Sequence, residues 1–122
     1  NGIVDVRDVA TAHIKAGFKP EASGRHIIVS KEAKLLDIAN ILRKYFGDDY
    51  PFPKREAPKF LFWLIAPMFD RTRNYVSKNV GFRVKFDNSY SKTDLNMSYI
   101  TIEQTIKEHF QQILDDGLLS TT

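Results

Sequence analysis

The sequence of 122 residues contains no cysteine. Disulfides, thiolate zinc sites and cysteine nucleophiles are therefore excluded, and stability has to come from packing and hydrogen bonds. A chain without cysteine suits a reducing compartment, and we expect the protein to be cytoplasmic. Residues 1–15 show no basic leader followed by an apolar run, so we expect no signal peptide.

The sequence also lacks a long apolar run. Its longest, residues 60–69, is about half of the roughly 20 residues that a membrane-spanning helix requires. Pro67 interrupts this run, because proline removes a helical hydrogen bond, and predicts a kink near Ala66. We therefore expect no membrane insertion.

Glycine is scarce and scattered. A dinucleotide pyrophosphate is bound by a glycine-rich turn between a strand and a helix, where backbone N–H groups approach the phosphates. The six glycines form no such cluster, because they stand at positions 2, 17, 24, 47, 81 and 117. We expect this chain alone to bind no nucleotide cofactor.

The composition, with 43% hydrophobic and 27% charged residues, is that of an ordinary globular domain. We expect residues 1–122 to form one domain. The net charge of +3 is unevenly placed, because nine Lys and Arg residues between Lys54 and Lys92 face only three acidic ones. This basic middle is suited to an anionic ligand, although mixed charge is also normal on a solvated surface.

The first thirty residues predict a strand, a helix and a second strand. Residues 2–6 indicate a short strand, and Asp8 is placed to cap a helix that runs to about Ala16 and stops at Gly17. Residues 25–30 contain a β-branched run that is typical of a buried strand.

The next predicted element is the best-defined helix of the chain, residues 35–46. Ser30 is a candidate for its cap, and Gly47 supplies a suitable end after two basic residues in the last turn. Its apolar residues recur at three- and four-residue spacing and define one stripe: Leu35, Ile38, Ala39, Leu42, Tyr45 and Phe46.

The C-terminal part predicts a strand and a final helix. Residues 82–86 alternate between apolar and basic side chains, and Ser91 with Asp94 makes a short capping pair. Thr101 and Gln104 form a capping box before a helix whose apolar stripe is Ile102, Ile106, Phe110 and Ile113 and which ends before Gly117. Together the elements predict a small mixed α/β fold, rich in helices with a few short strands.

The order of these segments is itself informative. The opening segment has the pattern V-x-V-x-D-V-A followed by A-H, a glycine introduces the second strand, a leucine-rich helix follows, and a polar stretch that approximates D-x-S-K-x-x-x-x-L precedes the capped terminal helix. The matching residues are Val4, Val6, Asp8, Val9, Ala10, Ala12, His13, the ranges 24–30 and 34–46, Pro51-Phe52-Pro53, Asp87, Ser89, Lys92 and Leu95. In this order, the chain resembles the C-terminal part of an extended short-chain dehydrogenase/reductase of the dihydroflavonol-4-reductase-like kind, in the NAD-dependent epimerase/dehydratase superfamily.

The resemblance implies a substrate-binding lobe whose Rossmann nucleotide-binding domain is missing. The complete enzyme would be an NAD(P)-dependent oxidoreductase, a carbonyl or dihydroflavonol-type reductase or a sugar-epimerase-like enzyme, acting on a small carbonyl or hydroxyl compound. The lobe alone is expected to be inactive. One departure concerns the subfamily: Asn96 and Met97 stand where such proteins usually have a glycine and a bulky residue.

Hydride transfer in that family also uses a tyrosine acid, with a lysine four residues later on the same helical face. Tyr50 and Lys54 have this spacing, but Pro51 and Pro53 between them are incompatible with a helix. We expect the pair not to be catalytic, and we expect no catalytic, cofactor-binding or metal-binding residue in this chain.

Other polar candidates have structural interpretations. His13, His26 and His109 are not at ligand spacing with one another, and we expect His13 to pack along the first helix. Asp5 and Asp8 are a carboxylate pair in sequence only, since helix capping accounts for Asp8 without acid–base chemistry.

Some side chains of the apolar run over residues 60–69 could line a substrate pocket. These are Phe60, Phe62, Trp63, Met68 and Phe69, for which ordinary core packing or docking on a nucleotide-binding domain is the alternative.

A different class of function stays open, namely an independent basic interaction module that binds nucleic acid or an anionic membrane surface. The low net charge and the acidic end of the last helix argue against it, and we expect neither partner. A lobe separated from its neighbour would expose apolar surface and a free strand edge, so we expect a homo-oligomer.

Overall fold

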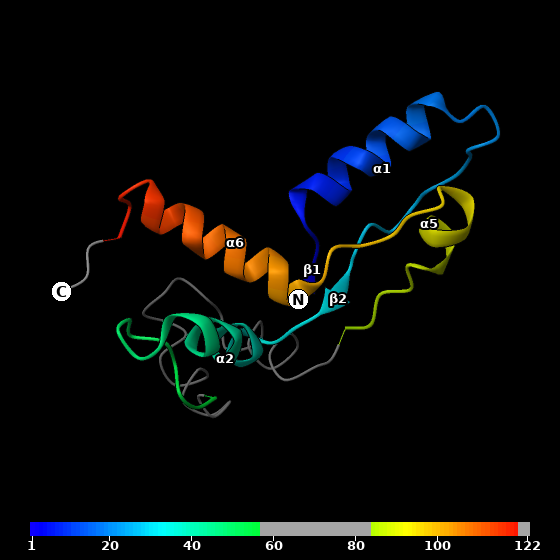
Figure 1. The fold of residues 1–122 in the computed structure, drawn as a ribbon. Coiled ribbons are helices and arrows are strands. Elements are labelled where there is room, and N and C mark those ends of the chain that lie inside the picture. Colours follow the sequence, from blue (N-terminus) through cyan, green and yellow to red (C-terminus); the bar gives the residue numbers. More distant parts are fainter. Residues whose placement is uncertain (57–83, 120–122) are drawn as a thin grey trace, which may run out of the picture.

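The computed structural model describes residues 1–56 and 84–119, in which four helices and two strands are formed (Figure 1). They are β1 (Gly2–Ile3), α1 (Val6–Phe18), β2 (Lys31–Glu32), α2 (Leu35–Phe46), α5 (Ser89–Asp94) and α6 (Ile102–Asp115). The prediction of a small, helix-rich α/β fold with short strands is confirmed at this level. None of the described helices is both long and apolar enough to cross a membrane.

Helix α1 begins earlier and ends later than the sequence predicts. Its cap is Asp5, whose carboxylate accepts a hydrogen bond from the Arg7 backbone N–H at 2.9 Å. Asp8 therefore lies inside the first turn, and the prediction that it caps the helix is wrong. Gly17 is part of the helix and does not have the positive φ of a helix-ending glycine; the helix ends at Phe18, with Lys19 as its C-cap.

The strand predicted over residues 2–6 is limited to Gly2–Ile3. It pairs antiparallel with β2, with Gly2 opposite Glu32 and Ile3 opposite Lys31. The predicted strand over residues 25–30 is wrong, because no strand forms there; its backbone makes single hydrogen bonds, such as the one from the Ser30 N–H to the Ile3 carbonyl oxygen of β1 at 2.8 Å. The side-chain amide of Asn88, for example, donates to the carbonyl oxygen of Val29 at 2.6 Å.

The predicted strand over residues 82–86 is also not formed where it can be followed. Residues 82 and 83 lie outside the described residues, and Val84 to Phe86 belong to no strand. The backbone N–H of Phe86 donates to the Glu32 carboxylate at 2.6 Å, so a side chain takes the place of a strand partner.

Helix α2 covers the predicted range, and Gly47 ends it with a φ of 67°. The prediction that Ser30 caps this helix is wrong. The helix starts after Lys34, whose backbone N–H donates to the Asp37 carboxylate at 2.9 Å, while Ser30 is used elsewhere. Within the predicted stripe Ala39 is buried, but Leu35 is 70% exposed, since it lies at the very start of the helix.

Helix α6 confirms the predicted Thr101 cap and apolar stripe, but not the full capping box, because the Gln104 side chain donates to the Glu108 carboxylate at 2.8 Å. The Thr101 hydroxyl accepts from the Gln104 backbone N–H at 3.3 Å, and Ile106 and Phe110 are buried. The capping pair of Ser91 and Asp94 is wrong, because Ser91 lies within α5 and is fully buried, and Asn88 holds the cap position.

Two small clusters form the interior of the described residues. One joins Ala12, Leu95 and Met97, with Ala22, Ile28 and Tyr99 packed against them. The other is aromatic and links α2 to α6: the rings of Phe46, Tyr50 and Phe52 surround Phe110 with centroid separations of 4.7 to 5.4 Å. Figure 1 shows α1 and α6 diverging from the short strand pair, with α2 alongside α6.

Candidate functional site

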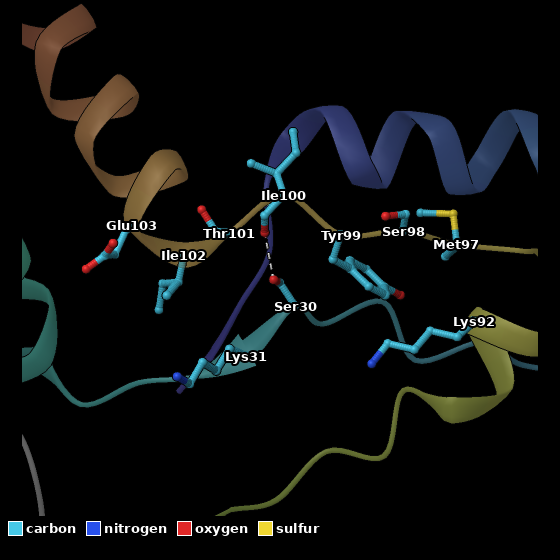
Figure 2. A pocket seen from close by; sticks show the side chains of 10 residues that line it. All are labelled: Ser30, Lys31, Lys92, Met97, Ser98, Tyr99, Ile100, Thr101, Ile102 and Glu103. Carbon is cyan, nitrogen blue, oxygen red and sulfur yellow. Dashed lines mark hydrogen bonds between the residues drawn. The ribbon is translucent and has the colours of Figure 1, made fainter.

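A solvent-open hollow of about 550 Å³ lies where β2, α5 and the start of α6 meet (Figure 2). The segment that leads into α6 forms one wall. Hydroxyl groups, two lysines and a tyrosine ring supply most of its chemistry. The lining residues are Ser30, Lys31, Lys92, Met97, Ser98, Tyr99, Ile100, Thr101, Ile102 and Glu103.

The wall segment is held at Ile100 from two sides. The Ser30 hydroxyl donates to the Ile100 carbonyl oxygen at 2.8 Å, the contact drawn in Figure 2. The Ile100 backbone N–H donates to the buried Asp8 carboxylate at 2.9 Å. Both polar groups of this residue are therefore satisfied by side chains from distant segments, which fixes the wall relative to α1 and β2.

Tyr99 is oriented by a second pair of hydrogen bonds. The Ser91 hydroxyl donates to the Asn88 carbonyl oxygen at 2.8 Å and lies 2.7 Å from the Tyr99 hydroxyl. Since Ser91 has only one hydroxyl proton and uses it toward Asn88, the Tyr99 hydroxyl is the donor in this contact. The tyrosine hydroxyl is thus bound inward, and its ring faces the hollow.

The hollow carries a positive charge. Glu103 is paired with Lys44, with the Lys44 amine 3.2 Å from the Glu103 carboxylate, and this contact raises the pKa of Lys44. Lys31 and Lys92 form no ion pair within the described ranges. Figure 2 shows both lysines on the same side of the segment that carries residues 97–101. The arrangement suits a ligand with an anionic group.

A second polar cluster joins the start of α1 to α6. Two guanidinium nitrogens of Arg7 each lie 2.8 Å from Asp5, and one of them also donates to Glu108 at 2.6 Å. The Thr105 hydroxyl donates to Asp5 at 2.9 Å. The guanidinium hydrogen bonds, followed by the capping bond and Thr105, hold the pKa of Asp5 well below its usual range.

The cluster around Asp5 has a structural role, because it joins the start of α1 to α6. A carboxylate that stays ionised far below neutral pH and already accepts four hydrogen bonds is poorly suited to take up a proton in catalysis. Asp8 is likewise buried and bound to the Ile100 backbone. The two carboxylates therefore act separately, as the sequence predicts, although the one that caps the helix is Asp5.

Tyr50 and Lys54 do not share a helical face, because no helix forms over this segment. The Tyr50 ring packs edge-on against Phe110 at 5.1 Å, and the Lys54 amine lies 3.2 Å from the Asp48 carboxylate. The two prolines between them account for the extended backbone.

The three histidines are in separate places. His13 is exposed on α1, and its Nδ1 lies 2.8 Å from the Val9 carbonyl oxygen of the same helix, in keeping with the prediction that it packs along the first helix. His109 is exposed on α6. In the parts of the chain that the structure describes, no group of three potential ligands is placed to hold a metal ion.

The partners of His26 could not be predicted from the sequence. Its Nε2 lies 2.6 Å from the Asp94 carboxylate, and its ring stacks on Tyr90 with centroids 4.7 Å apart. The Lys19 amine also donates to the Asp94 backbone carbonyl. These contacts fasten the segment before β2 to α5, and they span 68 and 75 residues of sequence.

The remaining sequence hypothesis concerns the aromatic pocket. Phe60, Phe62, Trp63, Met68 and Phe69 lie outside the described residues. The lining of the hollow was missed by sequence reasoning because its residues come from segments about 60 positions apart. A weak indication was the position of Lys92 in the D-x-S-K stretch.

Comparison with known proteins identifies reductases. The chain is 31% identical over 116 residues to cinnamoyl-CoA reductase 1 of Petunia hybrida, in an alignment that covers 95% of this chain and 29% of that protein. It is 33% identical over 115 residues to an NADPH-dependent methylglyoxal reductase of Saccharomyces cerevisiae, covering 93% and 29%. Cinnamoyl-CoA reductase 2 of Arabidopsis thaliana is 40% identical over 52 residues, covering 43% and 15%.

No protein-family model matches the chain, and no solved structure matches it significantly. The two longest alignments cover 29% of the reductases concerned, so the chain spans about three tenths of the length of these relatives. These relatives are reductases, which agrees with the kind of enzyme that the order of the motifs indicates.

Proposed function

We propose that this chain is the substrate-binding part of an NAD(P)-dependent oxidoreductase of the extended short-chain dehydrogenase/reductase superfamily. The observation that carries the proposal is the 95% coverage of this chain by an alignment that takes up only 29% of a cinnamoyl-CoA reductase. A chain that aligns almost entirely with a minor part of a larger enzyme most simply corresponds to that part. The motif order places it at the C-terminal end, after the nucleotide-binding domain.

In this proposal the complete polypeptide transfers hydride between a nicotinamide cofactor and a small carbonyl or hydroxyl compound. The described residues contain no glycine-rich phosphate loop and no helical tyrosine–lysine pair, and the complete enzyme would supply both from its nucleotide-binding domain. The present chain contributes shape and charge at the substrate.

The direct test compares NADPH oxidation by the 122-residue chain and by the longer polypeptide encoded by the same gene. With a panel of aldehydes and ketones, we expect oxidation at 340 nm for the longer polypeptide and none above background for the chain. Turnover by the chain alone would contradict the proposal, and so would an inactive longer polypeptide that binds neither NADH nor NADPH in a fluorescence titration.

We further propose that the hollow around Tyr99 contacts the substrate, and that Lys31 and Lys92 favour an acidic group on it. In the longer polypeptide, replacing both (Lys31→Gln, Lys92→Gln) should raise KM for 4-carboxybenzaldehyde about tenfold, which corresponds to about 1.4 kcal/mol. KM for the methyl ester of 4-carboxybenzaldehyde should change by less than about twofold, because the ester lacks the negative charge.

Two controls sharpen this measurement. Lys107→Gln removes a lysine on the exposed side of α6 that does not line the hollow, and it should leave both KM values unchanged. An equal rise in KM for the acid and the ester after the double replacement would contradict the assignment of the two lysines.

A further inference from the structure

Helix α1 presents its apolar side to solvent. Val6, Ala10, Ile14 and Phe18 follow one another at four-residue steps, which places them along one side of the helix. All four are exposed, with Val6 at 78%, Ile14 at 61% and Phe18 at 85%. A helix in a finished domain normally turns such a stripe toward the interior.

The opposite side of α1 already has its partners. Ala12 is buried against Leu95 and Met97, and Asp8 is buried and bonded to the Ile100 backbone. The helix therefore cannot rotate to bury the apolar side without breaking these contacts. The exposed stripe is a fixed feature of the fold.

An apolar groove continues this stripe at the N-terminal end of α1. A hollow of about 610 Å³ lies between the start of α1, α2 and α6, and Val6 belongs to both the hollow and the stripe. Its apolar lining also includes Ile3, Val4, Ile38, Leu42, Ile106 and Phe110. We call the stripe and the groove together the α1 apolar surface; Figure 1 shows the helices that carry it, α1, α2 and α6.

Little charge is available on this surface for a polar partner. Arg7, at the edge of the stripe, is already paired with Asp5 and Glu108. Single exposed apolar residues are normal, but a contiguous set that runs into a groove marks an interface. The partner should therefore present apolar side chains and not phosphates.

We propose that the α1 apolar surface is the face on which the remainder of a reductase-length polypeptide packs. This inference rests on the proposed function, because its occupant follows from length: the relatives continue well beyond the 29% of their sequence that this chain matches. A covalently attached partner is always present at high effective concentration, which favours it over a second copy.

The test compares the 122-residue chain with the longer polypeptide encoded by the same gene. Hydrogen exchange of both unmodified proteins should show α1 amides that exchange at least about tenfold more slowly in the longer polypeptide. The double variant Ile14→Ser, Phe18→Ser should lower the Tm of the longer polypeptide by about 5 °C or more, and that of the chain by less than about 2 °C.

Leu35→Ser is the matched control, since Leu35 is 70% exposed, apolar and outside the α1 apolar surface. It should shift the Tm of both proteins equally and by less than about 2 °C. The hydrogen-exchange comparison uses only unmodified proteins, so it can be carried out even if a variant fails to fold.

Two results would overturn the inference. One is equal exchange of α1 in both proteins at a concentration where the chain is monomeric, and the other is a gene that encodes no further domain. The proposed function fails separately: a longer polypeptide with a protected α1 that binds no nicotinamide cofactor would contradict the function and uphold the interface.

Discussion

At the scale of single residues, Asp5 shows how one carboxylate organises two helices. Its side chain is buried, caps α1, and binds Arg7 and Thr105, the latter from α6. The sequence alone favours Asp8, three residues later, as the cap. The choice depends on Arg7 and Thr105, and the second of these lies 100 positions away, so local patterns could not decide it.

The same residue gives a prediction for stability and pH. Asp5→Asn keeps the shape but removes the charge opposite Arg7, and it should lower the free energy of unfolding by about 2 kcal/mol at pH 7. The folded pKa lies well below the unfolded value of about 3.9, so the stabilisation is fully present above that value and is lost progressively as the pH falls from there towards the folded pKa.

Urea unfolding of the variant and the unmodified chain between pH 7 and pH 3 tests this prediction. The difference between the two proteins should shrink as the pH falls below about 4. Asp49→Asn, at an exposed carboxylate, serves as the control and should change stability by less than about 0.5 kcal/mol. A constant difference across the pH range would show that the charge of Asp5 is not what stabilises the cluster.

At the scale of elements, helices could be predicted and strands could not. Helices α2 and α6 follow from periodic apolar residues and local caps such as Thr101, all within one segment of chain. A strand depends on a partner elsewhere in the sequence, and the backbone of residues 25–30 makes only isolated hydrogen bonds, one to the Asn88 side chain and one to the Ile3 carbonyl oxygen. The hollow around Tyr99 could not be predicted for the same reason.

The packing between α2 and α6 gives a second stability prediction. Phe110 is 8% exposed and is surrounded by three aromatic rings, so Phe110→Ala should cost about 3 to 5 kcal/mol. Phe18→Ala removes the same kind of side chain at a position where it is 85% exposed. In the isolated chain this substitution should lower the free energy of unfolding by less than about 1 kcal/mol.

Chemical denaturation of the two variants side by side measures this contrast. Since the substitution is identical, the difference reports burial alone. Equal losses would mean that α1 buries Phe18 in solution, which would contradict the arrangement of α1 described above.

At the scale of the whole molecule, the described interior is small for the apolar residues available. Its buried apolar side chains are three alanines and four larger residues, Leu95, Met97, Ile106 and Phe110. Large side chains on α1 remain in solvent at the same time. This imbalance fits a chain that is one part of a larger enzyme, and it is the structural counterpart of the partial alignment with the reductases.

The expectation of a homo-oligomer stays a prediction and can now be made specific. If the α1 apolar surface is uncovered in the isolated chain, self-association should bury it, because apolar area is removed from water when two such faces meet. Light scattering over a hundredfold range of concentration should show a rising mean mass for the unmodified chain. Ile14→Asp with Phe18→Asp should keep the chain monomeric, whereas Leu35→Asp, on α2, should not.

A chain that is monomeric throughout that range would indicate that the stripe is too small to hold two copies together, and self-association unaffected by the α1 variants would place the contact elsewhere.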